Sequence, residues 1–343
     1  MAGSLNGFSG SNSFGLTFTF LSQHFEEAFQ LLTEVICQPS FDKEEMEKRR
    51  RLILASIRQQ EDDLGRLVFK LFWKTLYEKH PYRMDTLGTY DSIQRLTRKD
   101  LMEYYQHVVL AENMVFTVVG DVDERQVLLA VKKGFGDLKR EPLLLPSITQ
   151  EPPIQKKRQV ELYKLKEQAH FILGFLGVSF QHPDSYPLRV LDAALSGQGG
   201  RLFRELRDKE SLAYALDFMA QPNLDPGYIG VYMGTHPDKL EKAIEAVLRE
   251  LKKVREEGLT EEEVERGKKY LIGNFEIGLQ TNSAQANQMS LDELYGFGFD
   301  HYQKYSQEIQ KVTKEDVNRA AKRHLDLEAY AIAIIRPPMD KKE

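Results

Sequence analysis

The feature of this chain that most constrains its fold is a long-range internal repeat. Leu96–Leu101 (LTRKDL) recurs as Val312–Val317 (VTKEDV), an offset of 216 residues (312 − 96), and each copy leads into a helical run and then an apolar strand, at 114–119 and 330–335. Two further pairs of segments keep nearly the same spacing: 42–48 with 260–266, and 14–20 with 229–235. Three segments in one order at a constant offset predict two duplicated domains rather than a short-repeat solenoid.

The two copies differ in length. About 75 residues (154–228) precede the second copy's equivalent of Phe14, whereas only 13 precede Phe14 itself, so we expect a first domain that is truncated at its start. A Pro-rich stretch at 142–153 predicts a linker. We therefore expect a first α+β domain at 1–145, a linker at 146–153 and a second α+β domain at 154–343. Each domain is expected to be a mostly antiparallel sheet covered by helices.

Local signals place the elements of these domains. Thr260 and Glu263 have the spacing of a capping box, and Asp42 and Glu45 have the same spacing with a less typical first residue. A long helix is therefore expected to begin at Thr260 and another at Asp42. Short runs rich in β-branched and aromatic residues predict strands at 14–20, 114–119, 170–175, 212–218 and 227–234.

Composition narrows the class of protein. The chain has 343 residues, 41% of them hydrophobic, and a net charge of −5, which is typical of a soluble, mildly acidic globular protein and gives no reason to expect nucleic acid as a partner. No run of apolar residues is long enough to predict a membrane span. The single cysteine, Cys37, is expected to be a small buried residue. The compartment stays open between cytoplasm and periplasm.

Neither of two candidate motifs predicts a site. His24-Phe25-Glu26-Glu27-Ala28 lacks the second histidine of the inverted zinc motif HxxEH, so it is interpreted as a solvated helix start. No two of the other histidines are spaced by three or four residues, and no local metal cluster is predicted. The glycine-rich loop 196–201 lacks GxGxxG and a Walker lysine, so its glycines indicate a tight helix entry rather than a nucleotide site.

A third segment carries more information. Arg207 is expected near the end of a helix and Tyr214 on the following strand, so a cation and a phenol could converge on one cleft. The residues alone favour a second interpretation, in which Arg207 is a surface ion-pair partner and Tyr214 a strand residue with its hydroxyl at an edge.

A family resemblance bears on this choice. The stretch 195–214, LSGQGGRLFRELRDKESLAY, resembles the signature of the second half of insulinase/pitrilysin-type zinc metallopeptidases. The first domain agrees in Pro39-Ser40-Phe41, in His80-Pro81-Tyr82, and in Asn113 leading to Val118-Val119-Gly120-Asp121. The resemblance spans about Leu5 to Pro337. It implies a clamshell enzyme in which two halves, each of two related domains, enclose a peptide substrate.

The resemblance also implies what this chain contributes. The long helix places Ser56 where the family's zinc-binding half carries its third metal ligand, a glutamate, and a neutral hydroxyl is a poor replacement. The resemblance therefore implies the non-zinc half, with no metal or cofactor bound by this chain and zinc in the complementary half. Arg207 and Tyr214 then match the pair that contacts the substrate and the transition state.

The expected partners are a peptide substrate and a zinc-bearing half, on the same longer chain or on a separate subunit. Alone, this chain is expected to be inactive. The alternative is a non-catalytic scaffold or peptide-binding subunit of the same family. The charged runs 239–257 and 261–269 are solvated helix faces on the simplest interpretation, and a partner-binding surface on the other.

Overall fold

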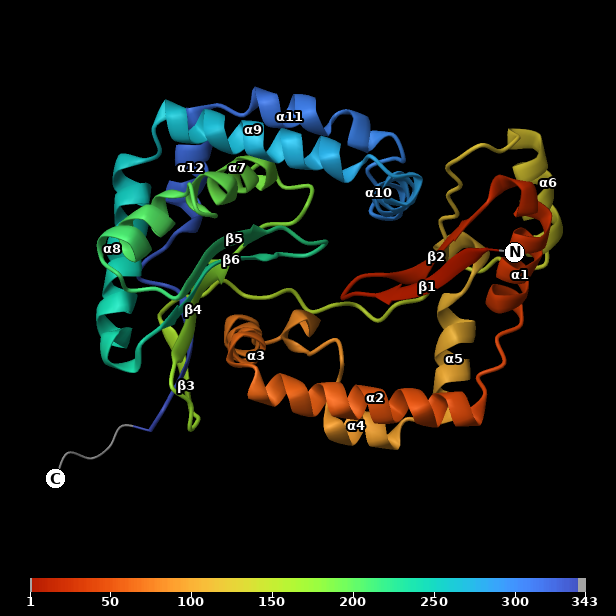
Figure 1. Ribbon diagram of the computed structural model, residues 1–343, viewed down its shortest axis with the longest axis horizontal. Coiled ribbons are helices and arrows are strands. Elements are labelled where there is room, and N and C mark those ends of the chain that lie inside the picture. Colours follow the sequence, from red (N-terminus) through yellow and green to blue (C-terminus); the bar gives the residue numbers. More distant parts are fainter. Residues whose placement is uncertain (1, 339–343) are drawn as a thin grey trace. The chain divides into compact units, whose positions relative to one another are not determined.

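The computed structural model describes residues 2–338 (Figure 1). These residues pack into two units built from interleaved stretches of chain. The first unit comprises the residues up to Ile57, Thr86–Ser147 and Phe275–Lys304; the second comprises Arg58–Asp85, Ile148–Asn274 and the residues from Tyr305 onward. Two of the five boundaries between the units fall within helices, α2 (Lys43–Asp62) and α9 (Glu261–Gly278). These units group residues that pack together and do not test domain boundaries along the chain. The domains at 1–145 and 154–343 and the linker between them therefore remain a prediction from the sequence.

The first unit contains one antiparallel hairpin and several helices. The hairpin joins β1 (Gly3–Ser9) and β2 (Phe14–Phe20). The helices are α1 (Phe25–Cys37), α4 (Tyr90–Arg95), α5 (Arg98–Val108), α6 (Glu124–Phe135) and α10 (Asn282–Leu294), with short 3-10 turns η1 (Ser22–His24), η3 (Ala111–Asn113) and η6 (His301–Gln303). The ring of Phe29 on α1 packs edge-on against Phe116 and Phe135, with ring centroids 5.6 and 5.7 Å away. An aromatic cluster therefore holds α1 and α6 together.

Two expectations for the first unit are wrong. Residues 114–119 form no regular secondary structure and pair with no strand among the described residues. Phe116 packs instead against Phe29 and Phe135. The apolar pattern predicts that these side chains are buried. A strand also needs a neighbouring strand with which its backbone can form hydrogen bonds. Cys37 is exposed rather than buried, because it ends α1 beyond the helix's buried face.

The second unit is built on a five-stranded sheet of order β3-β7-β4-β6-β5. The strands are β3 (Arg158–Tyr163), β4 (Ala169–Leu176), β5 (Ala215–Gln221), β6 (Tyr228–Thr235) and β7 (Ala331–Arg336). All neighbours run antiparallel except β3 and β7. The predicted strands 14–20, 170–175 and 227–234 are confirmed within one residue, and β5 begins three residues later than the predicted 212.

Helices cover both faces of this sheet (Figure 1). They are α3 (Leu64–Leu76), α7 (Ser185–Leu195), η4 (Phe203–Lys209), α8 (Leu240–Glu257), α11 (Tyr305–Lys311) and α12 (Lys314–His324), with 3-10 turns η2 (Pro81–Arg83) and η5 (Pro237–Lys239). Successive residues of β7 alternate between the two faces. Ile332 and Ile334 join the core under α7, α8 and α12, while Ala333 and Ile335 join the core under α3. The observed fold is α+β, as predicted.

The repeated segments begin equivalent helices. Thr97 and Asp100 form a capping box at the start of α5, and Thr313 and Asp316 form the same box at the start of α12. Both helices have 11 residues. The box predicted at Thr260 is also present, since its N–H donates to Glu263 Oε2 at 2.9 Å and Glu263 N–H donates back to Thr260 Oγ1 at 3.3 Å. Within the described part of the chain, none of the helices has both the length and the apolar character to cross a lipid bilayer.

Candidate functional site

Arg207 lies on η4, the short helix that follows the glycine-rich loop. This helix has the wider π-type turn, a geometry that often occurs at functional sites. Its buried residue, Leu206, anchors it in the core, while Arg207 is exposed and its guanidinium lies 4.7 Å from the centre of the Phe203 ring. A cation held over an aromatic face keeps its orientation without being buried. The helix runs to Lys209, two residues beyond the predicted end.

A tight loop connects Arg207 to Tyr214. Leu212 N–H donates to the Leu206 carbonyl at 2.9 Å and closes the loop, and Ser211 takes a positive φ of 53° at its tip. The Leu212 carbonyl in turn accepts a 2.6 Å hydrogen bond from Thr235 Oγ1 at the end of β6. The loop is therefore tied both to the helix before it and to the sheet after it.

Tyr214 lies immediately before β5, not on it as predicted. Its N–H donates to the Gly234 carbonyl at 2.8 Å, so its backbone continues the β5–β6 ladder. The side chain is 56% exposed, and it faces an open hollow of about 490 Å³. The hollow is lined by Lys166, Glu167, Gln168, Tyr214, His236, Pro237 and Pro337. A phenol presented at the end of an edge strand can donate a hydrogen bond to a molecule in this hollow.

A short connection therefore separates the two predicted residues in the structure. The 2.9 Å hydrogen bond between Leu212 and Leu206 joins the residue before Arg207 to a residue two positions before Tyr214. Among the described residues, no hydrogen bond joins the two side chains directly, and both are exposed. Their roles toward a substrate stay a prediction.

The family's catalytic zinc does not fit the residues of this chain. Ser56, on α2, is exposed and offers only a hydroxyl. In the segment His24–Ala28, His24 Nδ1 lies 3.5 Å from Glu27 Oε2. Ala28 is fully buried in the core and offers no ligand atom. The interpretation of this segment as a solvated helix start is confirmed, since Glu26 and Glu27 are exposed in the first turn of α1.

The glycine-rich loop is a helix entry, as expected. A Cβ at Gly200 would lie 2.2 Å from the Leu195 carbonyl oxygen, and Gly197 takes a φ of +71° that favours glycine. Ser196 Oγ lies 2.6 Å from Asp192 Oδ1 and 2.5 Å from the Phe218 carbonyl oxygen, and its single hydrogen serves these two acceptors. These contacts fix the loop to α7 and β5, and the glycines allow the backbone to make the turn.

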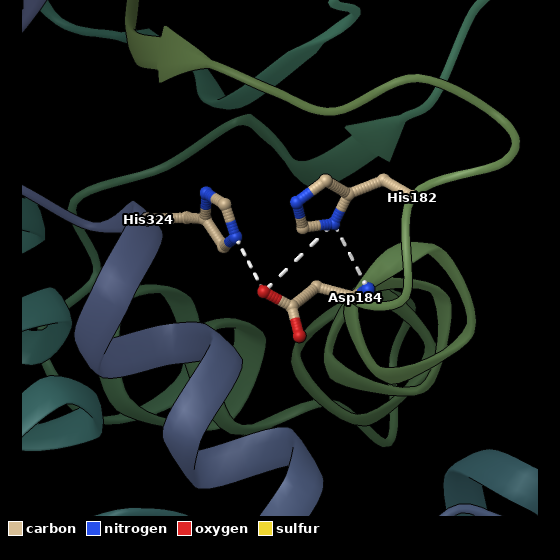
Figure 2. Close-up of side chains that lie close together, drawn as sticks. All are labelled: His182, Asp184 and His324. Atoms are coloured by element: carbon tan, nitrogen blue, oxygen red, sulfur yellow. Dashed lines mark hydrogen bonds and ion pairs between the residues drawn. The ribbon is translucent and has the colours of Figure 1, made fainter.

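The fold assembles one cluster that sequence spacing misses. Figure 2 shows His182, in the loop before α7, and His324, at the end of α12, with their rings pointing toward Asp184 at the start of α7. His324 Nε2 lies 2.8 Å from Asp184 Oδ2, and His182 Nδ1 lies 3.9 Å from the same oxygen. Within residues 2–338, this is the one group of three histidine, cysteine or carboxylate residues whose ligand atoms all lie within 4.8 Å of one another. The two histidines are far apart in sequence, so no local pattern could have found them.

Two arginines complete this cluster. Arg319 lies 3.2 Å from Asp184 Oδ1 and Arg323 lies 3.5 Å from Asp184 Oδ2. Burial by itself would raise the pKa of Asp184, but hydrogen bonds from His324 and Arg319 outweigh it and hold the pKa below its usual value. Burial lowers the pKa of His324, although the hydrogen bond to Asp184 and the negative charge of that carboxylate act to raise it.

Comparison with known proteins identifies the family. Residues 1–90 match the insulinase family (peptidase family M16), and residues 95–271, more than half of the chain, match the peptidase M16 inactive domain. The chain belongs to peptidase family M16. The predicted resemblance is confirmed.

Relatives within the M16 family carry mixed names. The chain is 27% identical to the "uncharacterized zinc protease YmxG" of Bacillus subtilis over 92% of this chain and 76% of that protein. It is 26% identical to the "non-peptidase homolog YmxG" of Helicobacter pylori over 97% of this chain and 77% of that protein. In fold, it is similar to a solved peptidase M16 inactive domain from Pseudomonas fluorescens, with a TM-score of 0.85 and 20% identity over 99% of this chain and 82% of that one.

Proposed function

We propose that this chain is the non-zinc half of a clamshell M16 endopeptidase, in which Arg207 and Tyr214 contact a peptide that is cleaved at zinc held by a complementary half. The proposal is supported by the short connection from Arg207, whose guanidinium lies over the Phe203 ring, to Tyr214, whose exposed phenol stands at the start of β5. Hydrogen-bond donors held ready for developing negative charge lower the transition-state energy more than the ground-state energy.

The sheet supports a mode of peptide binding. β5 is an edge strand that pairs with β6 alone among the described strands, and Tyr214 directly precedes it. An extended peptide can add to such an edge through main-chain hydrogen bonds, which give affinity with loose sequence preference. The substrate main chain would then run past the Tyr214 hydroxyl, where the phenol donates to the scissile carbonyl oxygen. Arg207 would hold a second carbonyl.

The test is a reconstituted assembly. The chain is co-expressed with an HxxEH-bearing M16 half and assayed with quenched fluorescent peptides. Tyr214→Phe removes only the hydroxyl, so kcat is expected to fall by about 10²–10³-fold while KM changes little. Arg207→Lys keeps the charge but loses the planar fork, so we expect a rise in KM. Tyr270→Phe, which alters a tyrosine 62% exposed on α9, serves as the matched control.

A second candidate is a non-catalytic scaffold or peptide-binding subunit, favoured by the similarity to a relative named as a non-peptidase homolog. It predicts unchanged turnover in Tyr214→Phe. If that variant and Arg207→Lys both retain the parent kcat and KM in an active assembly, the catalytic role is rejected in favour of the scaffold.

A further inference from the structure

We infer that His182, Asp184 and His324 form a binding site for a divalent transition-metal ion such as Zn²⁺. This site shares no residue with the Arg207–Tyr214 loop, and neither the sequence spacing nor the family resemblance predicts it. Two imidazoles and one carboxylate are a donor set that Zn²⁺ and its first-row neighbours prefer.

The distances suit one shared ion. Zinc ligands lie about 2.0–2.2 Å from the metal, so two of them are about 3 to 4 Å apart. The distances from Asp184 Oδ2 to His324 Nε2 and His182 Nδ1 are 2.8 and 3.9 Å. Both rings point toward the same carboxylate oxygen (Figure 2), and all three ligand atoms lie within 4.8 Å of one another, so an ion would draw the three donors together from positions that are already close.

Metal binding requires an unprotonated nitrogen on each imidazole. His182 Nδ1 accepts a 3.0 Å hydrogen bond from Asp184 N–H, so this nitrogen is the unprotonated one, and an ion bound to it would replace that hydrogen bond. His324 Nε2 faces the carboxylate, and an ion bound between them would take the place of the hydrogen they share, with the ring proton moving to Nδ1. The ring of a neutral histidine allows this exchange of tautomers.

The surroundings combine a fixed carboxylate with an open side. The Asp184 side chain is 3% exposed, whereas that of His182 is 28% exposed, so an ion could enter past His182 and complete its coordination with water. Arg319 holds Asp184 Oδ1 and leaves Oδ2 toward the histidines, as outer partners of metal ligands commonly do. Arg323 is the competing cation, at 3.5 Å from Oδ2, but its side chain is 64% exposed and can turn into solvent.

A bound ion would clamp two helices. His182 and Asp184 stand at the beginning of α7, and His324 at the end of α12, so coordination would tie these helix ends together. Binding to the folded chain alone raises its stability by mass action.

The experiment uses the full chain after treatment with chelator. We expect one Zn²⁺ per chain by isothermal titration calorimetry, visible d–d absorption with Co²⁺, and a higher melting temperature with either ion. His182→Asn and His324→Asn should each weaken binding at least about tenfold. His107→Asn, at an exposed histidine on α5, is the matched control and should bind as the parent does.

Arg323→Gln tests the site without removing a ligand, at an exposed position where folding is not at risk. Loss of the competing cation should tighten Zn²⁺ binding several-fold. The inference is overturned if the parent binds neither ion below about 1 mM, if the two ligand variants bind as His107→Asn does, or if Arg323→Gln leaves the affinity unchanged. In those cases the cluster is an ion-pair network that joins α7 to α12.

Discussion

At the scale of single residues, Asp192 on α7 is a carboxylate whose pKa the fold raises strongly. Its oxygens accept from Ser196 Oγ at 2.6 Å and from Ala220 N–H at 2.9 Å, which ties the glycine-rich loop to β5. Burial raises its pKa from 3.8 to about 6 although these two hydrogen bonds lower it. The folded chain therefore holds a proton on Asp192 more tightly than the unfolded chain does.

This raised pKa predicts the direction in which the free energy of unfolding changes with pH. The stability contributed by the protonated form is fully present below the unfolded value of 3.8 and is lost as the pH rises through about 6. The loss is roughly 3 kcal/mol at most, for a shift of about two pKa units. Asp192→Asn keeps the shape without the charge, so its free energy of unfolding should not show this fall between pH 4 and 7.

Urea unfolding across that pH range checks the prediction. Asp208→Asn, at an exposed aspartate on η4, provides the comparison and should retain the parent's pH dependence. Identical pH profiles for Asp192→Asn and the parent would contradict the assignment.

At the scale of elements, the segment 146–153, expected to be a linker, is fixed to the residues that follow α3. The Glu151 side chain is fully buried, and its oxygens accept from the N–H groups of Glu78, Lys79 and His80 at 2.7, 2.8 and 2.9 Å. Arg158, at 3.8 Å, supplies the balancing charge. One carboxylate thus satisfies three donors that follow α3.

Replacing this carboxylate should destabilise the fold. Glu151→Gln leaves a single acceptor for three N–H groups, and we expect a loss of about 2–3 kcal/mol at pH 7. Burial by itself would raise the pKa of Glu151, but the three hydrogen bonds hold it below its ordinary 4.5. The stabilisation is therefore present above about pH 4.5 and is lost as the pH falls through the folded pKa.

Chemical denaturation at pH 7 and pH 3 measures the effect. The difference between the parent and Glu151→Gln should shrink at the lower pH. Glu141→Gln, at an exposed glutamate of the same connecting region, should unfold like the parent at both. A constant difference between parent and Glu151→Gln would argue against a charged Glu151 in the folded chain.

At the scale of the whole molecule, the proposed division of labour requires a second half. By the family resemblance, Ser56 stands where a catalytic half would carry its third zinc ligand, and a neutral hydroxyl is a poor ligand for zinc. We expect the purified chain with added Zn²⁺ to show no chelator-sensitive peptide hydrolysis, and Ser56→Glu, which supplies one carboxylate, not to create any. A Zn²⁺ bound at His182, Asp184 and His324 would leave this result unchanged, because that site lacks Arg207 and Tyr214. Robust hydrolysis by the chain alone would reject the proposed function.

The sequence by itself determined the features that depend on short spacings. The capping box at Thr260, the strands predicted at 170–175 and 227–234 and the segment 195–214 are all local patterns, and each predicts structure or family membership without knowledge of distant neighbours. The tertiary structure decided what depends on partners far along the chain. Residues 114–119 have the apolar pattern of a strand but no ladder, Cys37 falls on the exposed side of its helix end, and His182 meets His324 only because α7 packs against α12. A local pattern specifies which way a side chain faces along its own element, whereas ladders, burial and ligand clusters depend on which elements the fold places beside one another.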